Sequence, residues 1–158
     1  MAEIARLVRP TQLIKIGFDA VDGARDRATR ISSYLPLEEQ YGYSRVVRVD
    51  GKVFVSGTTA RDTDGYVVAP GDQYGQARVC FEIISAAMVE AGAALADMNY
   101  TETFVTNMEQ SGEQREAKLE ALGDIQPTGT LLGIPVMIGE PTVIEIEAEA
   151  IVGAAASR

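Results

Sequence analysis

The chain is predicted to fold as an α+β domain in which two helices cover one face of a mixed β-sheet. Strict alternation of apolar and polar residues over 143–150 predicts a half-buried strand, and Asp50-Gly51 between two β-branched runs predicts a hairpin. Apolar residues at spacings of three and four predict a helix over 72–91. A Ser-x-x-Gln pattern predicts a second helix from 111. The predicted order is β-β-α-β-α-β-β.

The composition is that of one ordinary globular domain. Hydrophobic residues make up 46% and charged residues 23% of the 158 residues, enough for a single core. We expect residues 1–40 to form an N-terminal extension and residues 41–158 the main domain. No run approaches the ~18 apolar residues that span a membrane, and we expect no secretory signal because residues 1–6 lead into no long apolar run. We therefore expect a cytoplasmic protein without membrane contact.

Charge and residue usage exclude several classes of function. The formal net charge is −9, whereas phosphate backbones are bound by clustered Lys and Arg, so we expect no nucleic-acid partner. The absence of histidine removes Ser-His and Cys-His pairs and histidine metal ligands. The lone Cys80 cannot form an internal disulfide and is expected in the core. The turn at 62–65 resembles half of a calcium loop but lacks the later ligands, so we expect no metal.

The first half of the chain contains a short strand and a hairpin. Residues 13–18 are expected to form a strand, with Ile14, Ile16 and Phe18 on one face, and residues 24–30 a helical turn or a loop. Residues 45–49 and 52–55 form the hairpin, for which a type I′ turn at Asp50-Gly51 is expected. Gly57 ends the second strand, either as a simple bulge or where a ligand or another backbone approaches closely.

The second half alternates helices and strands. Asp72 is expected to cap the helix over 72–91, and Gly92 to follow its end. The next expected elements are a strand over 100–106, a helix over 111–122 and a strand over 130–138. Pro135 cannot donate to a ladder, so this last strand is expected at an edge or with a bulge.

The final strand, over 143–152, presents three glutamates on one face. Glu145, Glu147 and Glu149 alternate with apolar residues, so they share the face opposite the core. Alternation alone does not distinguish a solvated face from one in which a single carboxylate enters a pocket.

Several segments in order resemble the RidA/YjgF/YER057c family, whose older label is endoribonuclease L-PSP. The resemblance covers about residues 42–153. Its segments are Gly42-Tyr43-Ser44, Val53-Phe54-Val55-Ser56-Gly57, 90–98, 103–108, Gln126-Pro127 and Ile144-Glu145-Ile146-Glu147-Ala148. The resemblance implies a chorismate-mutase-like fold of the bacillus type, homotrimers and a small-molecule pocket between subunits. The best-characterised members hydrolyse enamines and imines, such as 2-iminopropionate, to 2-keto acids and ammonia without a cofactor.

Position by position, the resemblance assigns Glu145 to the glutamate that positions or activates water and Tyr43 to the pocket tyrosine. Ser56 and Gly57 match the Ser-Gly pair that completes the pocket. In the family, an arginine of a Pro-Ala-Arg-Ser segment binds the substrate carboxylate as a bidentate fork. Here that segment reads Pro127-Thr128-Gly129-Thr130, so Gly129 stands where the family has arginine, and the resemblance implies that Gly129 and Thr130 lie in the substrate-binding site.

Three functions fit this pattern. The first is a trimer with a small-molecule pocket that lacks the standard 2-iminopropionate deaminase activity because of Gly129. The second is an active enamine or imine deaminase with another anchor, such as Arg115 on the second helix or backbone N–H groups. The third is a non-catalytic binding or interaction protein on the same scaffold, which a pocket filled by side chains would favour.

Overall fold

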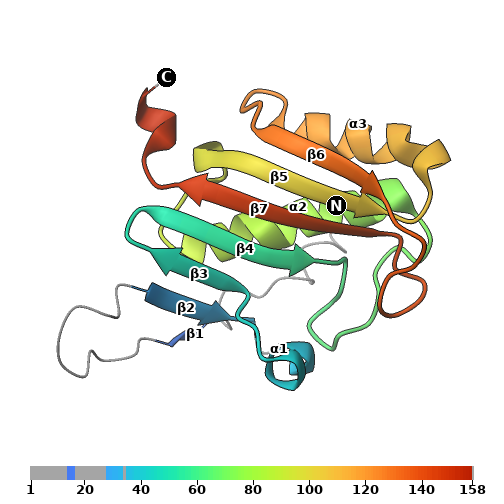
Figure 1. Ribbon diagram of the computed structural model, residues 1–158, viewed down its shortest axis with the longest axis horizontal. Coiled ribbons are helices and arrows are strands. Elements are labelled where there is room, and N and C mark those ends of the chain that lie inside the picture. The colour runs from blue at the N-terminus through green and yellow to red at the C-terminus, as the bar shows by residue number, and fades with distance from the viewer. Residues whose placement is uncertain (1–13, 17–27, 34, 158) are drawn as a thin grey trace.

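The computed structural model describes residues 14–16, 28–33 and 35–157, which form one seven-stranded mixed sheet with its helices (Figure 1). The strand order is β1-β2-β3-β4-β7-β5-β6, and only the β5–β6 pair is parallel among the described strands. The strands are β1 Ile14–Ile16, β2 Ala28–Ser32, β3 Val46–Val49, β4 Lys52–Thr58, β5 Met98–Val105, β6 Thr128–Gly133 and β7 Ile144–Ile151. The predicted α+β class and mixed sheet are confirmed.

Two long helices, α2 (Gln73–Glu90) and α3 (Ser111–Leu122), lie behind the sheet in Figure 1. Asp72 caps α2 by accepting the Gly75 N–H at 2.9 Å, and Gly92 follows the helix with φ 73°, both as predicted. Ser111 does not cap α3, because it is the first helical residue and Gln110 takes the cap position without a side-chain hydrogen bond. Short 3₁₀ turns cover Leu95–Asp97, Met108–Gln110 and Ala154–Ser157.

The core lies between the sheet and these helices. On α2, the side chains of Cys80, Ile84 and Met88 are fully buried in this core. The core-facing residues of β7 are 0–2% exposed: Ile144, Ile146, Ala148 and Ala150. Full burial of each large aliphatic side chain contributes about 1.5–3 kcal/mol. Among the described elements, α2 and α3 lie on one side of the sheet (Figure 1), and the alternation along β7 places its glutamates on the face opposite the core.

The N-terminal part of the chain differs from the prediction. Residues 28–30, expected in a helical turn or loop, belong to β2, which pairs with β3 through Ala28–Val49 to Ile31–Val46. The pairing places Ile31 in the core at 0% exposure, which stabilises a strand despite its polar neighbours. A short helix, α1 (Pro36–Tyr41), was not predicted. A strand was expected over residues 13–18, with Ile14, Ile16 and Phe18 on one face. The structure describes only residues 14–16 of this segment, so Phe18 lies outside the described residues.

Two further details are corrected. β6 ends at Gly133 rather than 138, because Pro135 has no N–H with which to extend the ladder, although β6 is an edge strand as expected. In the β3–β4 turn, Asp50 has φ 53° but Gly51 does not have a positive φ, so the turn is not type I′. The Gly51 carbonyl accepts the Val152 N–H at 2.8 Å, which ties this turn to the chain after β7.

Candidate functional site

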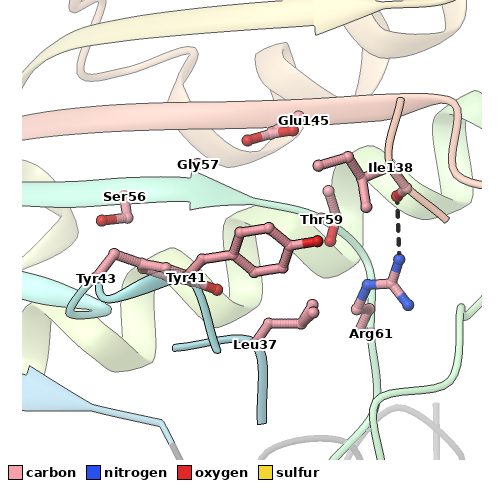
Figure 2. A pocket seen from close by; sticks show the side chains of 9 residues that line it. All are labelled: Leu37, Tyr41, Tyr43, Ser56, Gly57, Thr59, Arg61, Ile138 and Glu145. Carbon is pink, nitrogen blue, oxygen red and sulfur yellow. Dashed lines mark hydrogen bonds between the residues drawn. The ribbon is translucent and has the colours of Figure 1, made fainter. Parts of the chain in front are cut away.

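Among the described residues, an open cavity of about 320 Å³ lies where the chain from β4 passes the start of β7 (Figure 2). Its volume is in the range of small-molecule pockets. β4, β7, α1 and the loops after α1, β4 and β6 contribute its lining: Leu37, Tyr41, Tyr43, Ser56, Gly57, Thr59, Arg61, Ile138 and Glu145. Four of the residues predicted for the site, Tyr43, Ser56, Gly57 and Glu145, therefore meet in one cavity.

Glu145 is the β7 glutamate that enters this cavity. It is partly buried, whereas Glu147 and Glu149 on the same face are exposed. Burial raises the pKa of the Glu145 carboxyl above its ordinary value, and the Glu147 carboxylate raises this pKa further, while the Arg45 guanidinium lowers it. A carboxyl group with a raised pKa in a cavity is suited to exchange protons with a ligand.

Gly57 allows Glu145 to take this position. The β4–β7 register shifts between Val55 and Thr58, so Gly57 lies at an irregularity of the ladder. A Cβ atom on Gly57 would lie 1.9 Å from Glu145 Oε1 and 2.9 Å from its Cδ. The glycine therefore serves both as a bulge residue and as the point of close approach.

Arg45 and Glu38 form a buried ion pair beside the cavity. Both side chains are 5% exposed, and Arg45 Nε lies 3.6 Å from Glu38 Oε1. Arg45 Nη1 donates to the Gly57 carbonyl at 3.1 Å and to Thr58 Oγ1 at 3.0 Å. Its guanidinium also lies 5.7 Å from the ring centroid of Tyr43. These contacts hold the β4 bulge and Tyr43 in place.

Tyr43 lines the cavity, and its hydroxyl oxygen accepts a hydrogen bond from Arg45 Nη2 at 3.4 Å. Burial raises the pKa of its hydroxyl; the Arg45 guanidinium lowers this pKa, and the Glu38 and Glu145 carboxylates raise it. Tyr43 is therefore a neutral hydrogen-bond donor or acceptor at neutral pH.

Arg61 also lines the cavity, and sequence reasoning missed it. Its Nη1 donates to the Gly65 carbonyl at 2.8 Å, and its Nη2 donates to the Ile138 carbonyl at 3.3 Å (Figure 2). These bonds join the turn at 62–65 to the loop after β6. The sequence offers only a weak indication that Arg61 belongs to the site, namely that it is the first cationic residue after the Ser56-Gly57 pair and lies four residues beyond Gly57.

Three predicted residues do not join this cavity within the chain. Gly129 and Thr130 lie on the edge strand β6, and Arg115 is exposed on α3 behind the sheet. A Cβ atom on Gly129 would lie 2.6 Å from Lys118 Nζ, which donates to Thr101 Oγ1 at 2.8 Å. The space beside Gly129 is therefore occupied by a lysine from α3, and burial lowers the pKa of this lysine.

Other candidate groups have structural roles in the described part of the chain. Cys80 is buried and donates its S–H to the Thr58 carbonyl at 3.2 Å, and burial raises the pKa of its thiol. Asp62 Oδ1 accepts hydrogen bonds from the N–H groups of Asp64 and Tyr66 and so closes the turn at 62–65.

No group of three or more His, Cys, Asp or Glu residues that could hold a metal ion is found among the described residues. Within the same residues, no helix is long and apolar enough to cross a membrane.

Known proteins match most of this chain. The family model described as Endoribonuclease L-PSP matches residues 36–152, which span every element from α1 to β7. An uncharacterized protein of Streptomyces coelicolor is 30% identical over 125 residues, covering 79% of this chain and 92% of that protein.

Solved structures show the same similarity. A Mycobacterium tuberculosis member of the YjgF/YER057c/UK114 family has a TM-score of 0.72 and 34% identity, covering 79% of this chain and 99% of that chain. E. coli TdcF with bound serine has a TM-score of 0.63 and 26% identity, covering 69% of this chain and 87% of that chain. The similarity therefore includes a structure that holds an amino acid.

Proposed function

The chain belongs to the endoribonuclease L-PSP family, the YjgF/YER057c/UK114 family of RidA-like proteins, and from this premise we propose that it hydrolyses a small imine or enamine in the Glu145 cavity. The observation that carries the proposal is the position of Glu145, whose carboxyl group is partly buried, has a raised pKa and lies against Gly57 in an open cavity. Perturbed carboxyl groups in cavities are characteristic of catalytic sites.

The proposed reaction consumes one water and carries both of its protons to the imine nitrogen. A water oxygen bonds to the imine carbon while Glu145 accepts a proton from that water and passes it to the nitrogen, which gives a carbinolamine. Glu145 then accepts the proton of the new hydroxyl group and passes it to the nitrogen as the C–N bond breaks, so that the products are a carbonyl compound and ammonia. A carboxyl group with a raised pKa is better matched to both transfers near neutral pH than an ordinary glutamate. No cofactor takes part in this scheme.

We propose that the substrate is anchored differently from that of family members with an arginine at position 129. Gly129 supplies no guanidinium, so 2-iminopropionate would lose a bidentate carboxylate contact, in which charge-assisted hydrogen bonds are each worth ~1.5–3 kcal/mol. The open cavity favours a working pocket over a purely structural scaffold, because the lining side chains leave about 320 Å³ unfilled. The serine bound in E. coli TdcF supports an amino-acid-like ligand. The net charge of −9 argues against RNA.

We propose a homotrimer with the ligand between subunits as the working form. Support comes from large apolar side chains that are exposed in the cavity or on the face of the sheet opposite the core: Phe54 at 39%, Leu132 at 41% and Ile138 at 70%. Analytical ultracentrifugation at micromolar concentration tests this state. A monomer would exclude a site shared between subunits.

The activity is tested with 2-imino acids generated freshly from a panel of amino acids by an amino-acid oxidase. Keto-acid formation is followed for the wild type, Glu145→Gln and Glu149→Gln, the last a matched control on the same strand and face. We expect acceleration above background by the wild type and the control, and its loss in Glu145→Gln. Equal rates for Glu145→Gln and the wild type would refute a catalytic role for this carboxyl group.

A further inference from the structure

Arg61 places a positive charge in the wall of the Glu145 cavity. No carboxylate of a described residue lies within 4.0 Å of its guanidinium, whereas Arg45 pairs with Glu38 and Arg78 with Glu120. The acceptors of Arg61 are all neutral: the carbonyls of Gly65 and Ile138, and Thr142 Oγ1 at 3.5 Å. Asp62, its neighbour in sequence, directs Oδ1 to backbone N–H groups of its own turn.

The guanidinium is also held in a defined place. Its contacts tie it to two separate loops, and Nε is buried without a hydrogen-bond partner. A Cβ atom on Gly139 would lie 2.3 Å from Nη2, so the loop after β6 passes close to it. A cation that is fixed, incompletely hydrogen-bonded and not paired with a carboxylate is preorganised for an anion entering the cavity.

The other cations discussed for this site, in the part of the chain that the structure describes, are already engaged or lie elsewhere. Arg45 is paired with Glu38 and hydrogen-bonded to the β4 bulge. Lys118 donates to Thr101, whose partner across the ladder, Ala148, faces the core rather than the cavity. Arg115 is exposed on α3. Within the cavity lining, Arg61 is the one cationic residue and Glu145 the one acidic residue.

We propose that Arg61 binds the carboxylate of the ligand and thereby selects small 2-imino and 2-keto acids for the Glu145 cavity. This inference rests on the proposed function, to which it adds the residue that anchors the ligand carboxylate in place of the arginine that Gly129 does not supply. Figure 2 shows Arg61 and Glu145 at different sides of the cavity, with Thr59 and Ile138 between them. A ligand that spans them presents a carboxylate to the guanidinium and an imine nitrogen or carbonyl to the carboxyl group.

The test uses pyruvate and its neutral amide, pyruvamide, as a matched pair of probes. Their dissociation constants are measured by NMR titration of the wild type, Arg61→Gln, Arg61→Lys and Arg78→Gln, the last a surface control on α2. We expect the wild type and Arg78→Gln to prefer pyruvate by at least about tenfold, as one charge-assisted hydrogen bond would give. Arg61→Gln should bind the two probes alike, and Arg61→Lys should keep part of the preference because it retains charge but not the planar fork.

The neutral probe separates recognition from a structural role. Pyruvamide binding should be the same in Arg61→Gln as in the wild type if Arg61 acts only on the carboxylate. Parallel loss of both probes in Arg61→Gln and Arg61→Lys would mean that Arg61 only holds the loops, and would overturn the proposal. An unchanged preference for pyruvate in Arg61→Gln would also overturn it, as would a wild type that binds the two probes equally or binds neither.

The failure of this inference is distinct from failure of the proposed function. If Glu145→Gln abolishes imine hydrolysis while Arg61→Gln still prefers pyruvate, the catalytic proposal stands and the anchor lies elsewhere. If Glu145→Gln hydrolyses imines as fast as the wild type, the proposed function is wrong whatever the Arg61 variants bind.

Discussion

Replacing Gly57 with alanine should displace the Glu145 carboxylate and leave the rest of the fold intact. The new Cβ atom would lie 1.9 Å from Glu145 Oε1, whereas ordinary contact begins at 3.4 Å. The oxygen must therefore move by about 1.5 Å, and a misplacement of ~1 Å can cost about 100-fold in rate. Because the clashing atoms are the far end of a flexible side chain, we expect a loss of stability below ~1 kcal/mol, less than typical overpacking of a rigid core.

The assay compares Gly57→Ala with Gly51→Ala, which lies in the same hairpin and where a Cβ atom would meet nothing within 4 Å. We expect kcat/KM for the imine that the wild type hydrolyses to fall by about 100-fold in Gly57→Ala and to stay within about twofold in Gly51→Ala. Thermal unfolding should be nearly the same for the two variants. Full activity in Gly57→Ala would show that the carboxylate need not lie against β4, and the geometric argument would then be wrong.

Three further predictions concern charge and burial. Arg45→Met should lower the free energy of unfolding in urea by about 3–5 kcal/mol, because it leaves the Glu38 carboxylate buried without its cation; a loss below ~1 kcal/mol would contradict this. Glu145→Gln should stabilise the protein at neutral pH, because the pKa of this carboxyl is raised in the folded state and its ionised form is therefore the destabilised one. That gain should shrink as the pH falls through the raised pKa and vanish below the ordinary value of 4.5, and denaturation curves at several pH values would measure it; a gain independent of pH would contradict the assignment. Cys80 should react with a thiol reagent only on unfolding, because it is 0% exposed and burial raises its pKa; stoichiometric labelling of the native protein within minutes would refute this.

The parts of the fold that follow from local patterns could be read from the sequence. Alternation along β7 directly reflects the two faces of a strand, and the buried and exposed residues follow it. The cap at Asp72 and the positive φ at Gly92 bound α2 for reasons contained in a few neighbouring residues. These elements needed no knowledge of distant contacts.

Strand β2 could not be read in this way. Its residues, Ala28–Ser32, have no alternating apolar pattern, and its strand conformation depends on pairing with β3, where Ile31 meets Val46. The short helix α1 has no apolar periodicity, and contacts outside the helix hold it, since its buried Glu38 pairs with Arg45 and accepts the Ser33 N–H.

The candidate site was predictable in part. Family resemblance pointed to Tyr43, Ser56, Gly57 and Glu145, which meet in one cavity, but strand periodicity treats the three β7 glutamates alike. The ladder irregularity near Gly57 distinguishes Glu145, and it depends on the pairing of two strands far apart in the chain. Arg61 reaches the cavity because the turn at 62–65 and the loop after β6 converge, which no local pattern encodes.

The position of Lys118 beside Gly129 bears on how this site could change over evolution. An arginine at position 129 would begin 2.6 Å from the Lys118 ammonium and 2.9 Å from the Thr101 hydroxyl that accepts its hydrogen bond. Two cations would then compete for one partner, so the single substitution is disfavoured while Lys118 remains. We therefore expect the two positions to be epistatic, so that an arginine introduced at position 129 requires Lys118 to change first or at the same time.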